Sequence, residues 1–293
     1  MKNIALFIIP TLIWGSTWYV IKFQVGDVDP MFSVSYRFLL AGIFMLVVAR
    51  FLKLKLSFTR KEHAFILLQG LLIFGFNYWL IYMSELYLTS GLVGLIFSLL
   101  VFFNIINARI FLKNKLEYKV IAGGLLGLFG TTLVFWDDLK AFSFDDGKLI
   151  GLMLAIGGTL VASLGNITSA RNTKSGIPVI SCNAFGMAYG GAAMMMIAFI
   201  SGKELSFIVT TEYISSLLYL AVFGSIIAFG AYLTLVGNIG AGKAAYVSLI
   251  VPVIALIIST IFEDYHWTVN SLSGAVLILA GNTIALYKPK SNS

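Results

Sequence analysis

Hydrophobic stretches of about 20 residues recur along the chain, and a short polar or basic segment ends each of them. A helix needs roughly 20 mainly apolar residues to cross the hydrocarbon core of a bilayer. The stretches of this length cover residues 4–23, 31–50, 63–84, 89–111, 117–136, 148–170, 178–200, 213–236, 242–262 and 267–287. Their connections are too short to hold a soluble domain. The pattern therefore predicts an all-α integral membrane protein with ten transmembrane helices.

The composition agrees with this pattern, because 59% of the residues are hydrophobic, 11% are charged and the mean hydropathy is +0.94. Soluble domains carry roughly 25% charged residues. The first stretch follows Lys2 as in a signal peptide, but it is too long and no small-x-small cleavage site follows it, so we expect a permanent helix. Cys182 is the only cysteine, which excludes a disulfide framework.

The basic residues predict how the chain is oriented, because cytoplasmic connections of membrane proteins are rich in lysine and arginine. With the N-terminus in the cytoplasm, the cytoplasmic ends hold 15 of the 20 basic residues and only Glu62 and Glu117 of the 13 acidic ones. The 15 are Lys2, Arg50, Lys53, Lys55, Arg60, Lys61, Arg109, Lys113, Lys115, Lys119, Arg171, Lys174, Lys243, Lys288 and Lys290. Both termini are therefore expected in the cytoplasm, with the protein in the inner (plasma) membrane. Because these residues fall in short connections and not along one stripe, the net charge of +7 does not indicate nucleic-acid binding.

The second half of the sequence repeats the first. A shift of 151 residues places Gly91 on Gly242, Phe111 on Phe262, Gly123 on Gly274, Gly130 on Gly281 and Thr132 on Thr283. We therefore divide the chain into residues 1–140 and 141–293, with five helices each. Since five is odd, the second half would enter the membrane inverted. Inverted repeats are common in secondary transporters, where the substrate site lies near the midplane between the halves.

Several motifs resemble a known family. They are "LIWGSTWYVIK" (12–22), Asp29-Pro30, "YRFLLAG" (36–42), "SELYLTSGLVGLIF" (84–97) and "GAGKAAYVSLIVPVIALIISTIFEDYHWT" (240–268). In this order they resemble EamA-type members of the drug/metabolite transporter superfamily. The resemblance implies transport of small molecules and favours export, without naming a substrate.

Two positions depart from the pattern of that family. The family usually has a proline in the fourth helix where this chain has Val101, although the repeat partner Pro252 is present. Glu263, at the end of the ninth helix, corresponds to Leu112 in the first half. These differences imply that the two halves differ in helix flexibility.

The first helix carries a polar, glycine-containing notch near its midpoint, "WGST" at residues 14–17. Helix packing is one interpretation, because small residues admit a neighbouring helix and hydroxyls bond the preceding turn. In an inverted-repeat transporter, polar groups beside an aromatic ring at mid-membrane are also what a solute pocket needs. We therefore expect Trp14 and Ser16 to line the substrate cavity.

Other polar residues at membrane depth are candidates for the same cavity. The first half adds Asn77, Tyr78, Tyr82 and Ser98, and the second half adds Ser163, Asn166, Tyr232, Tyr246 and Ser248. We expect Asn77 to face the interior, since an amide is costly in lipid. Glycines four residues apart, such as Gly123 with Gly127 and Gly186 with Gly190, are expected to pack helices closely.

Three charged residues, Lys22, Arg37 and Glu85, lie toward the outer ends of their helices. Lys22 is close enough to the boundary to extend its ammonium group into the interface. Arg37 lies deeper, and Glu85 is its expected partner in a structural or gating ion pair. A proton-coupling role for Glu85 is the alternative.

The sequence offers little support for other classes of function. "GNIGAGKA" (237–244) has alanine where a phosphate-binding loop needs serine or threonine and follows no strand, and Asn166 lies too deep to be glycosylated. His63 and His266 are far apart, and every aspartate lies outside the spans, so neither a cofactor or metal site nor an enzyme is expected. A non-transporting receptor or assembly subunit would leave the repeat unexplained.

We therefore expect a secondary transporter with a small-molecule substrate and the lipid bilayer as partners. No ATPase domain is present in the sequence, so coupling would come from a proton, another ion, solute exchange or the solute gradient. No acidic residue lies at mid-membrane, which favours neutral or zwitterionic solutes such as amino acids, related metabolites or drug-like compounds. The sequence leaves open whether the protein is a monomer or a homodimer.

Overall fold

The computed structural model describes residues 2–24, 26, 28–140, 142, 146–262 and 266–286, and the regular elements of this part are all helical. The elements are α1 (Lys2–Ile21), η1 (Lys22–Gln24), α2 (Pro30–Phe51), α3 (Arg60–Gln69), η2 (Gly70–Asn77), α4 (Tyr78–Ser84), α5 (Ser90–Phe97), α6 (Leu100–Leu112), α7 (Tyr118–Val134), α8 (Trp136–Lys140), α9 (Asp146–Lys174), α10 (Val179–Ile200), α11 (Thr211–Tyr219), η3 (Leu220–Ile227), α12 (Ala228–Ile239), α13 (Ala241–Ala244), α14 (Tyr246–Phe262) and α15 (Val269–Leu286).

Nine helical stretches of the described chain are long and apolar enough to cross a membrane. They correspond to nine of the ten expected helices. The remaining one, expected at residues 117–136, is α7, a mainly apolar helix whose length of 17 residues is at the lower limit of about 17–25 for a spanning helix. The short helix α8 follows α7 after the single residue Phe135, which ends the longer helix. The expected all-helical fold with membrane-length helices is therefore confirmed for the described residues.

Local sequence fixes where the helices of the first half begin. The Asp29 carboxylate accepts a hydrogen bond from the Met31 amide at 2.9 Å, and Pro30 occupies the first turn of α2. Thr59 and Glu62 form a reciprocal capping box at the start of α3. Such caps satisfy amide groups that have no partner within the helix.

Of the ten stretches expected from the sequence, the third (63–84) and the eighth (213–236) each contain a π-helical segment of eight residues, η2 and η3 respectively. Each end of η3 lies 150 residues after the corresponding end of η2. π-Helical turns are rare and are often found at functional sites. Their matched positions are a structural counterpart of the repeat in the sequence.

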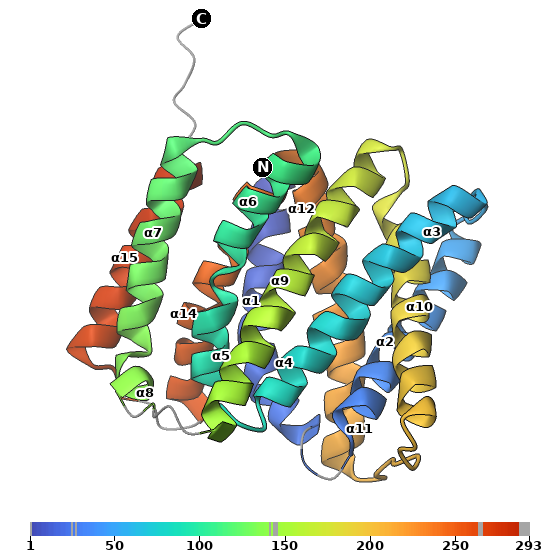
Figure 1. Ribbon diagram of the computed structural model, residues 1–293, viewed down its shortest axis with the longest axis horizontal. Helices are drawn as coiled ribbons and strands as arrows, with labels where there is room; N and C mark the ends of the chain where they lie inside the picture. Colours follow the sequence, from blue (N-terminus) through green and yellow to red (C-terminus); the bar gives the residue numbers. More distant parts are fainter. Residues whose placement is uncertain are drawn as a thin grey trace, which may run out of the picture.

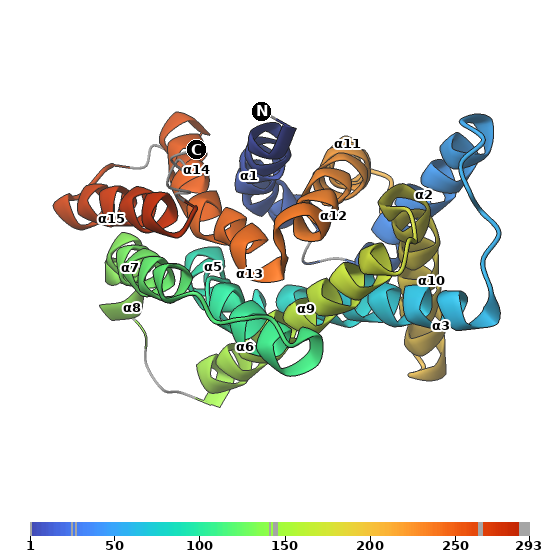
Figure 2. The same ribbon diagram turned by 90° about the horizontal axis from the view of Figure 1, so that it is seen from above.

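Two closely packed helix pairs form the ends of the molecule, as the perpendicular views in Figures 1 and 2 show. At one end α7 lies along α15, and at the other α2 lies along α10. Glycines permit both contacts. At the second contact, a methyl group on Gly191 would lie 2.7 Å from the Leu39 amide nitrogen. A methyl group on Gly123 would lie 2.4 Å from the Gly281 carbonyl oxygen at the first contact, and one on Gly190 would lie 2.6 Å from the Gly70 carbonyl oxygen, where α10 also packs against η2. The predicted packing role of Gly123 and Gly190 is confirmed.

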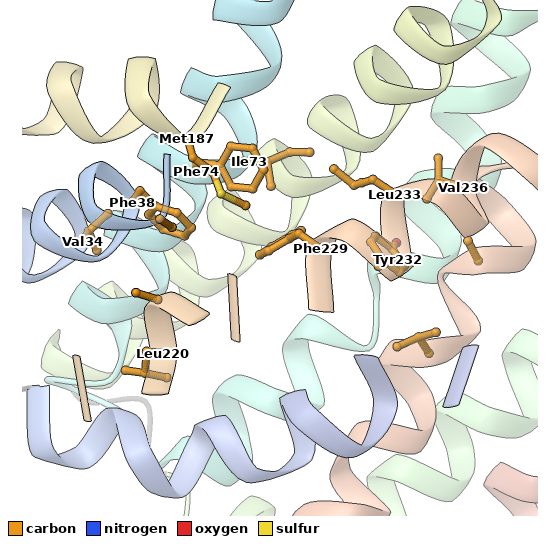
Figure 3. Packing of buried hydrophobic residues seen from close by; sticks show 14 of the residues in the cluster. Val34, Phe38, Ile73, Phe74, Met187, Leu220, Phe229, Tyr232, Leu233 and Val236 are labelled. Atoms are coloured by element: carbon orange, nitrogen blue, oxygen red, sulfur yellow. The ribbon is translucent and has the colours of Figure 1, made fainter. Parts of the chain in front are cut away.

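Between the two pairs, α1 contacts α12 and α14, while α9 contacts α4 and α6. A hydrophobic core joins segments of both halves there (Figure 3). In it, the Phe74 ring of η2 meets the Phe229 ring of α12 edge to face, with 5.0 Å between the ring centroids. The core thus holds η2 and α12 in place near α1, and the cavity lies between these three elements.

Candidate functional site

A cavity lies among α1, η2, α4, α5, α6, α9, α12 and α14. Each half of the chain contributes three membrane-length stretches to its wall. The lining residues are Trp14, Thr17, Ile21, Ile73, Asn77, Tyr78, Ile81, Gly94, Phe97, Leu100, Ala162, Asn166, Phe229, Tyr232, Ser248, Val251 and Pro252. The cavity encloses about 90 Å³, several times the ~10–15 Å³ that one water molecule requires.

Trp14 lines the cavity, and three contacts hold its indole ring. Its Nε1–H donates a hydrogen bond to the Gly224 carbonyl oxygen in η3 at 3.1 Å. The ring meets Phe229 and Tyr232 of α12 edge to face, with centroid distances of 4.9 and 5.0 Å. Trp14 therefore connects the first helix of one half to the eighth stretch in the other half.

Ser16, the other candidate in this helix, is not among the residues that line this cavity. Its hydroxyl donates to the Ile13 carbonyl oxygen at 2.7 Å, which leaves it to accept from the Tyr219 hydroxyl at 2.5 Å. Two residues turn a helix by about 200°, so Ser16 faces away from Trp14. Thr17, three residues after Trp14, shares its face and lines the cavity. The spacing of three residues from Trp14 is the feature of the sequence that could have identified Thr17 as a lining residue.

In the third stretch, Asn77 and Tyr78 line the cavity but Tyr82 does not. The Asn77 side chain donates to the Ile73 carbonyl oxygen at 3.3 Å, and its own oxygen is buried without a hydrogen-bond partner among the described residues. Tyr82, also buried, instead accepts a long hydrogen bond of 3.4 Å from Arg37. The π-helical segment η2 ends at Asn77, directly before the cavity-facing Tyr78.

In the second half, Asn166, Tyr232 and Ser248 line the cavity. The Asn166 amide donates to the Tyr232 hydroxyl at 3.0 Å, which fixes both side chains. The Ser248 hydroxyl donates to the Ala245 carbonyl oxygen at 2.7 Å.

Three other expected lining residues, Ser98, Ser163 and Tyr246, are buried in helix contacts outside the lining. Ser98 donates to the Gly94 carbonyl oxygen at 3.1 Å, in the break between α5 and α6. The Ser163 hydroxyl accepts from the Asn107 amide at 2.9 Å, and the Tyr246 hydroxyl donates to the Val120 carbonyl oxygen. In each case a nearby acceptor or donor satisfies the hydroxyl.

The expected ion pair between Arg37 and Glu85 is not formed among the described residues. Arg37 is 1% exposed and donates through Nε to the Ser225 hydroxyl at 2.9 Å. Glu85 is the C-cap residue of α4, one turn beyond Tyr82, and one of its carboxylate oxygens is buried without a hydrogen-bond partner among the described residues. Arg37 lies instead at the level of Tyr78 and Tyr82. Lys22, in η1, is exposed at the end of α1, and its ammonium lies 5.9 Å from the centre of the Tyr19 ring.

The cavity wall is mainly apolar and aromatic, with a few hydrogen-bonding groups. None of the described lining residues carries an ionisable Asp, Glu, His, Lys or Arg side chain. Within the described ranges, no group of three or more His, Cys, Asp or Glu side chains is placed to hold a metal ion. Such a wall binds small molecules by shape and ring contacts, while a few polar groups fix their orientation.

Known proteins similar to this chain include several bacterial transporters. The uncharacterized inner membrane transporter YedA of Escherichia coli strain K12 is 29% identical over 253 residues, which covers 85% of this chain and 79% of YedA. The protein PagO of Salmonella typhimurium strain LT2 is 23% identical, covering 96% and 91%. The uncharacterized transporter YvbV of Bacillus subtilis strain 168 is 27% identical, covering 96% and 90%.

A solved crystal structure has the same fold. It superposes on 97% of this chain and 96% of its own with a TM-score of 0.81, at 16% sequence identity. The EamA-like transporter family matches the chain twice, over residues 1–136 and 149–287, once in each half. The protein is therefore a membrane transporter that belongs to the EamA-like transporter family.

Proposed function

We propose that this protein is a secondary transporter that exports small organic solutes by alternating access, with the cavity as its solute site. The supporting observation is that three stretches from each half line this cavity. When two halves rock about a shared site, a bound solute is exposed first on one side of the membrane and then on the other.

In this proposal the ten helices form two inverted repeats of five, residues 1–140 and 141–293. The two family matches, one in each half, support the division. So do η2 and η3, which lie 150 residues apart. The short helix α7 is the fifth helix of the first half, and its neighbour α15 is the fifth of the second.

The lining favours a solute with an apolar body and few polar groups. Trp14, Tyr78, Phe229 and Tyr232 offer aromatic surface, while Asn77 offers an unpartnered acceptor. Amino acids, related metabolites and drug-like compounds of small size have this character.

A two-step experiment tests the proposal. The purified protein is screened against a metabolite panel for a rise in melting temperature, since a ligand that binds only the folded state stabilises it by about 2.7 kcal/mol at a concentration of 100 Kd. Each stabilising solute is then tested for movement across sealed vesicles that contain the protein. We expect the stabilising solutes to be transported. Stabilisation without transport of any of them would indicate a receptor.

The orientation is tested with cysteines at Lys55 and Lys203, which lie in connections at opposite ends of the long helices, at the top and the bottom of the view in Figure 1. The native Cys182 is buried, so its background labelling should be low. In sealed cells, an impermeant reagent should label the cysteine at 203 but not the one at 55, because the basic connections are expected in the cytoplasm. Labelling of both from outside would contradict the proposed topology. Asp145, also predicted on the outer side, and Glu263 lie outside the described residues.

Glu85 is the candidate for proton coupling. One of its carboxylate oxygens is buried without a hydrogen-bond partner in the described ranges, and Lys22 is close enough to affect the carboxyl group electrostatically. We expect Glu85→Gln to abolish uptake driven by a pH gradient while solute exchange continues, because exchange needs no net proton movement. The matched control is Glu117→Gln, whose carboxylate pairs with Lys243 at an exposed position. Undiminished pH-driven uptake by Glu85→Gln would exclude this role.

A further inference from the structure

Arg37 is a buried cation for which the described residues supply no anion. Its side chain is 1% exposed, and no carboxylate of the described residues forms an ion pair with it. Its Nη2 atom is buried and has no hydrogen-bond partner in the part of the chain that the structure describes. Native structures rarely leave a charged donor in this condition, because desolvation of an unpaired charge is costly. An ionisable residue at membrane depth therefore indicates a functional site.

The guanidinium group lies directly behind the cavity wall. Its central carbon is 4.6 Å from the centre of the Tyr78 ring, and Tyr78 lines the cavity. A methyl group on Gly224 would lie 3.0 Å from Nη2 and 3.2 Å from the methyl group of Thr17, another lining residue. Gly224 also accepts the indole hydrogen bond of Trp14. Nη2 is thus next to the face of α1 that carries Trp14 and Thr17.

The rings around Arg37 stabilise its charge without neutralising it. Phe38 and Tyr78 lie with their ring centres 5.1 and 4.6 Å from the guanidinium carbon. Nε donates a hydrogen bond to the Ser225 hydroxyl, and Nη1 donates one to the Tyr82 hydroxyl. These contacts hold the Nε and Nη1 side of the guanidinium group in place. Nη2 is left available to a hydrogen-bond acceptor that is not part of the protein.

Resting on the proposed function, we infer that Arg37 binds the carboxylate of the transported solute and thereby selects solutes that carry one. A single cation next to an apolar cavity matches a monoanion, and the described lining offers no second cation for a doubly charged group. Arginine is suited to this task because its planar fork matches the geometry of a carboxylate. In the bound state we place the solute carboxylate between Thr17 and Tyr78, against Nη2 of Arg37. The apolar part of the solute then lies against Trp14 and Phe229.

Two kinds of solute present this carboxylate, an organic acid and a zwitterion. The side-chain oxygen of Asn77, unpartnered among the described residues and on the cavity wall, can accept a hydrogen bond from the ammonium group of a zwitterion. A simple organic acid has no such donor. Four probes separate these cases: L-leucine, L-leucinamide, 4-methylpentanoate and 4-methylpentanamide. Only the first and third carry a carboxylate, and only the first two carry an amine.

The test compares Arg37→Met and Arg37→Lys with the unmodified protein in reconstituted vesicles, by binding and by transport of the four probes. The methionine variant is expected to fold, since an apolar side chain of similar volume often replaces a buried charge without loss of stability. We expect a preference for the carboxylate probes in the unmodified protein and a loss of about tenfold to a hundredfold in their affinity in Arg37→Met. The amides should change less than about threefold in the same variant, and Arg37→Lys should recover part of the loss.

The outcomes separate this inference from the proposed function. If Arg37→Met binds the carboxylate probes as tightly as the unmodified protein, or loses carboxylates and amides equally, Arg37 does not recognise the anion. If the unmodified protein shows no preference for carboxylates, the inference also fails, although the metabolite screen can still establish transport. If Asn77→Leu weakens leucine binding but not 4-methylpentanoate binding, the solute is a zwitterion.

Discussion

Replacement of Gly94 by leucine is expected to reduce transport at least about tenfold and to leave the fold intact. Gly94 lines the cavity from α5, and a methyl group added there would meet no atom within 4 Å. A leucine side chain would therefore extend into space that the solute needs. The helix itself would not suffer, since glycine is about 1 kcal/mol less favourable than alanine within a helix. The measurement is the initial rate of solute transport in vesicles, beside the unfolding midpoint of the purified variant.

Gly230 provides the matched control for this prediction. It is also a helical glycine, in α12, and a methyl group there would likewise meet no atom within 4 Å, but it does not line the cavity. Gly230→Leu should keep both stability and transport, whereas Gly94→Ala should show an intermediate rate. Normal transport by Gly94→Leu would mean that the solute does not pass through this cavity.

Replacement of Trp14 by alanine is expected to weaken solute binding by about tenfold to a hundredfold. This range corresponds to the loss of roughly 1.5–3 kcal/mol of apolar contact from a large side chain. Trp14→Phe should keep part of the ring contact with Phe229 and Tyr232 but lose the hydrogen bond to Gly224, at a cost of about 1 kcal/mol. The measurement is solute affinity by thermal stabilisation, with transport rates corrected for the amount of folded protein.

A second tryptophan separates loss of the cavity wall from loss of stability. Trp79 lies in α4, packs against the same hydrophobic core and does not line the cavity. Trp79→Ala should lower the melting temperature but preserve solute affinity in the protein that remains folded. If Trp14→Ala behaves in the same way as Trp79→Ala, Trp14 serves packing and the solute site lies elsewhere.

Much of the fold could be predicted from the sequence because a bilayer imposes simple constraints. Each spanning segment must satisfy its own backbone hydrogen bonds and must be apolar over a fixed length. Both properties are visible in one sequence, and the described helices match the expected stretches. A close helix contact at Gly123 was also predicted, since glycine allows two backbones to come near, but its partner Gly281 is known only from the structure. The motifs that resemble the EamA-type family led to the family that the comparisons then established.

The membership of the cavity was predicted only in part. Trp14, Asn77, Tyr78, Asn166, Tyr232 and Ser248 line it, whereas Ser16, Tyr82, Ser98, Ser163 and Tyr246 do not. Polarity at membrane depth identifies a side chain that needs a partner, but it does not say whether that partner is solute or protein. Ser163 finds its partner in Asn107, and Ser16 finds one in Tyr219.

What the sequence by itself determined was therefore the helices, their repetition and the presence of polar groups that cannot face lipid. Only the tertiary structure decided which of these groups face each other. Each successive residue of an α-helix points about 100° further around the helix axis. The π-helical segments η2 and η3 change this rotation, and with it the direction of the side chains, in the helices that carry Asn77 and Tyr232. The partner of Arg37 depends on the same geometry. Arg37 donates a hydrogen bond to Ser225, 188 positions along the chain, and forms no ion pair with Glu85 among the described residues, because the contact between α2 and η3 exists only in the folded chain.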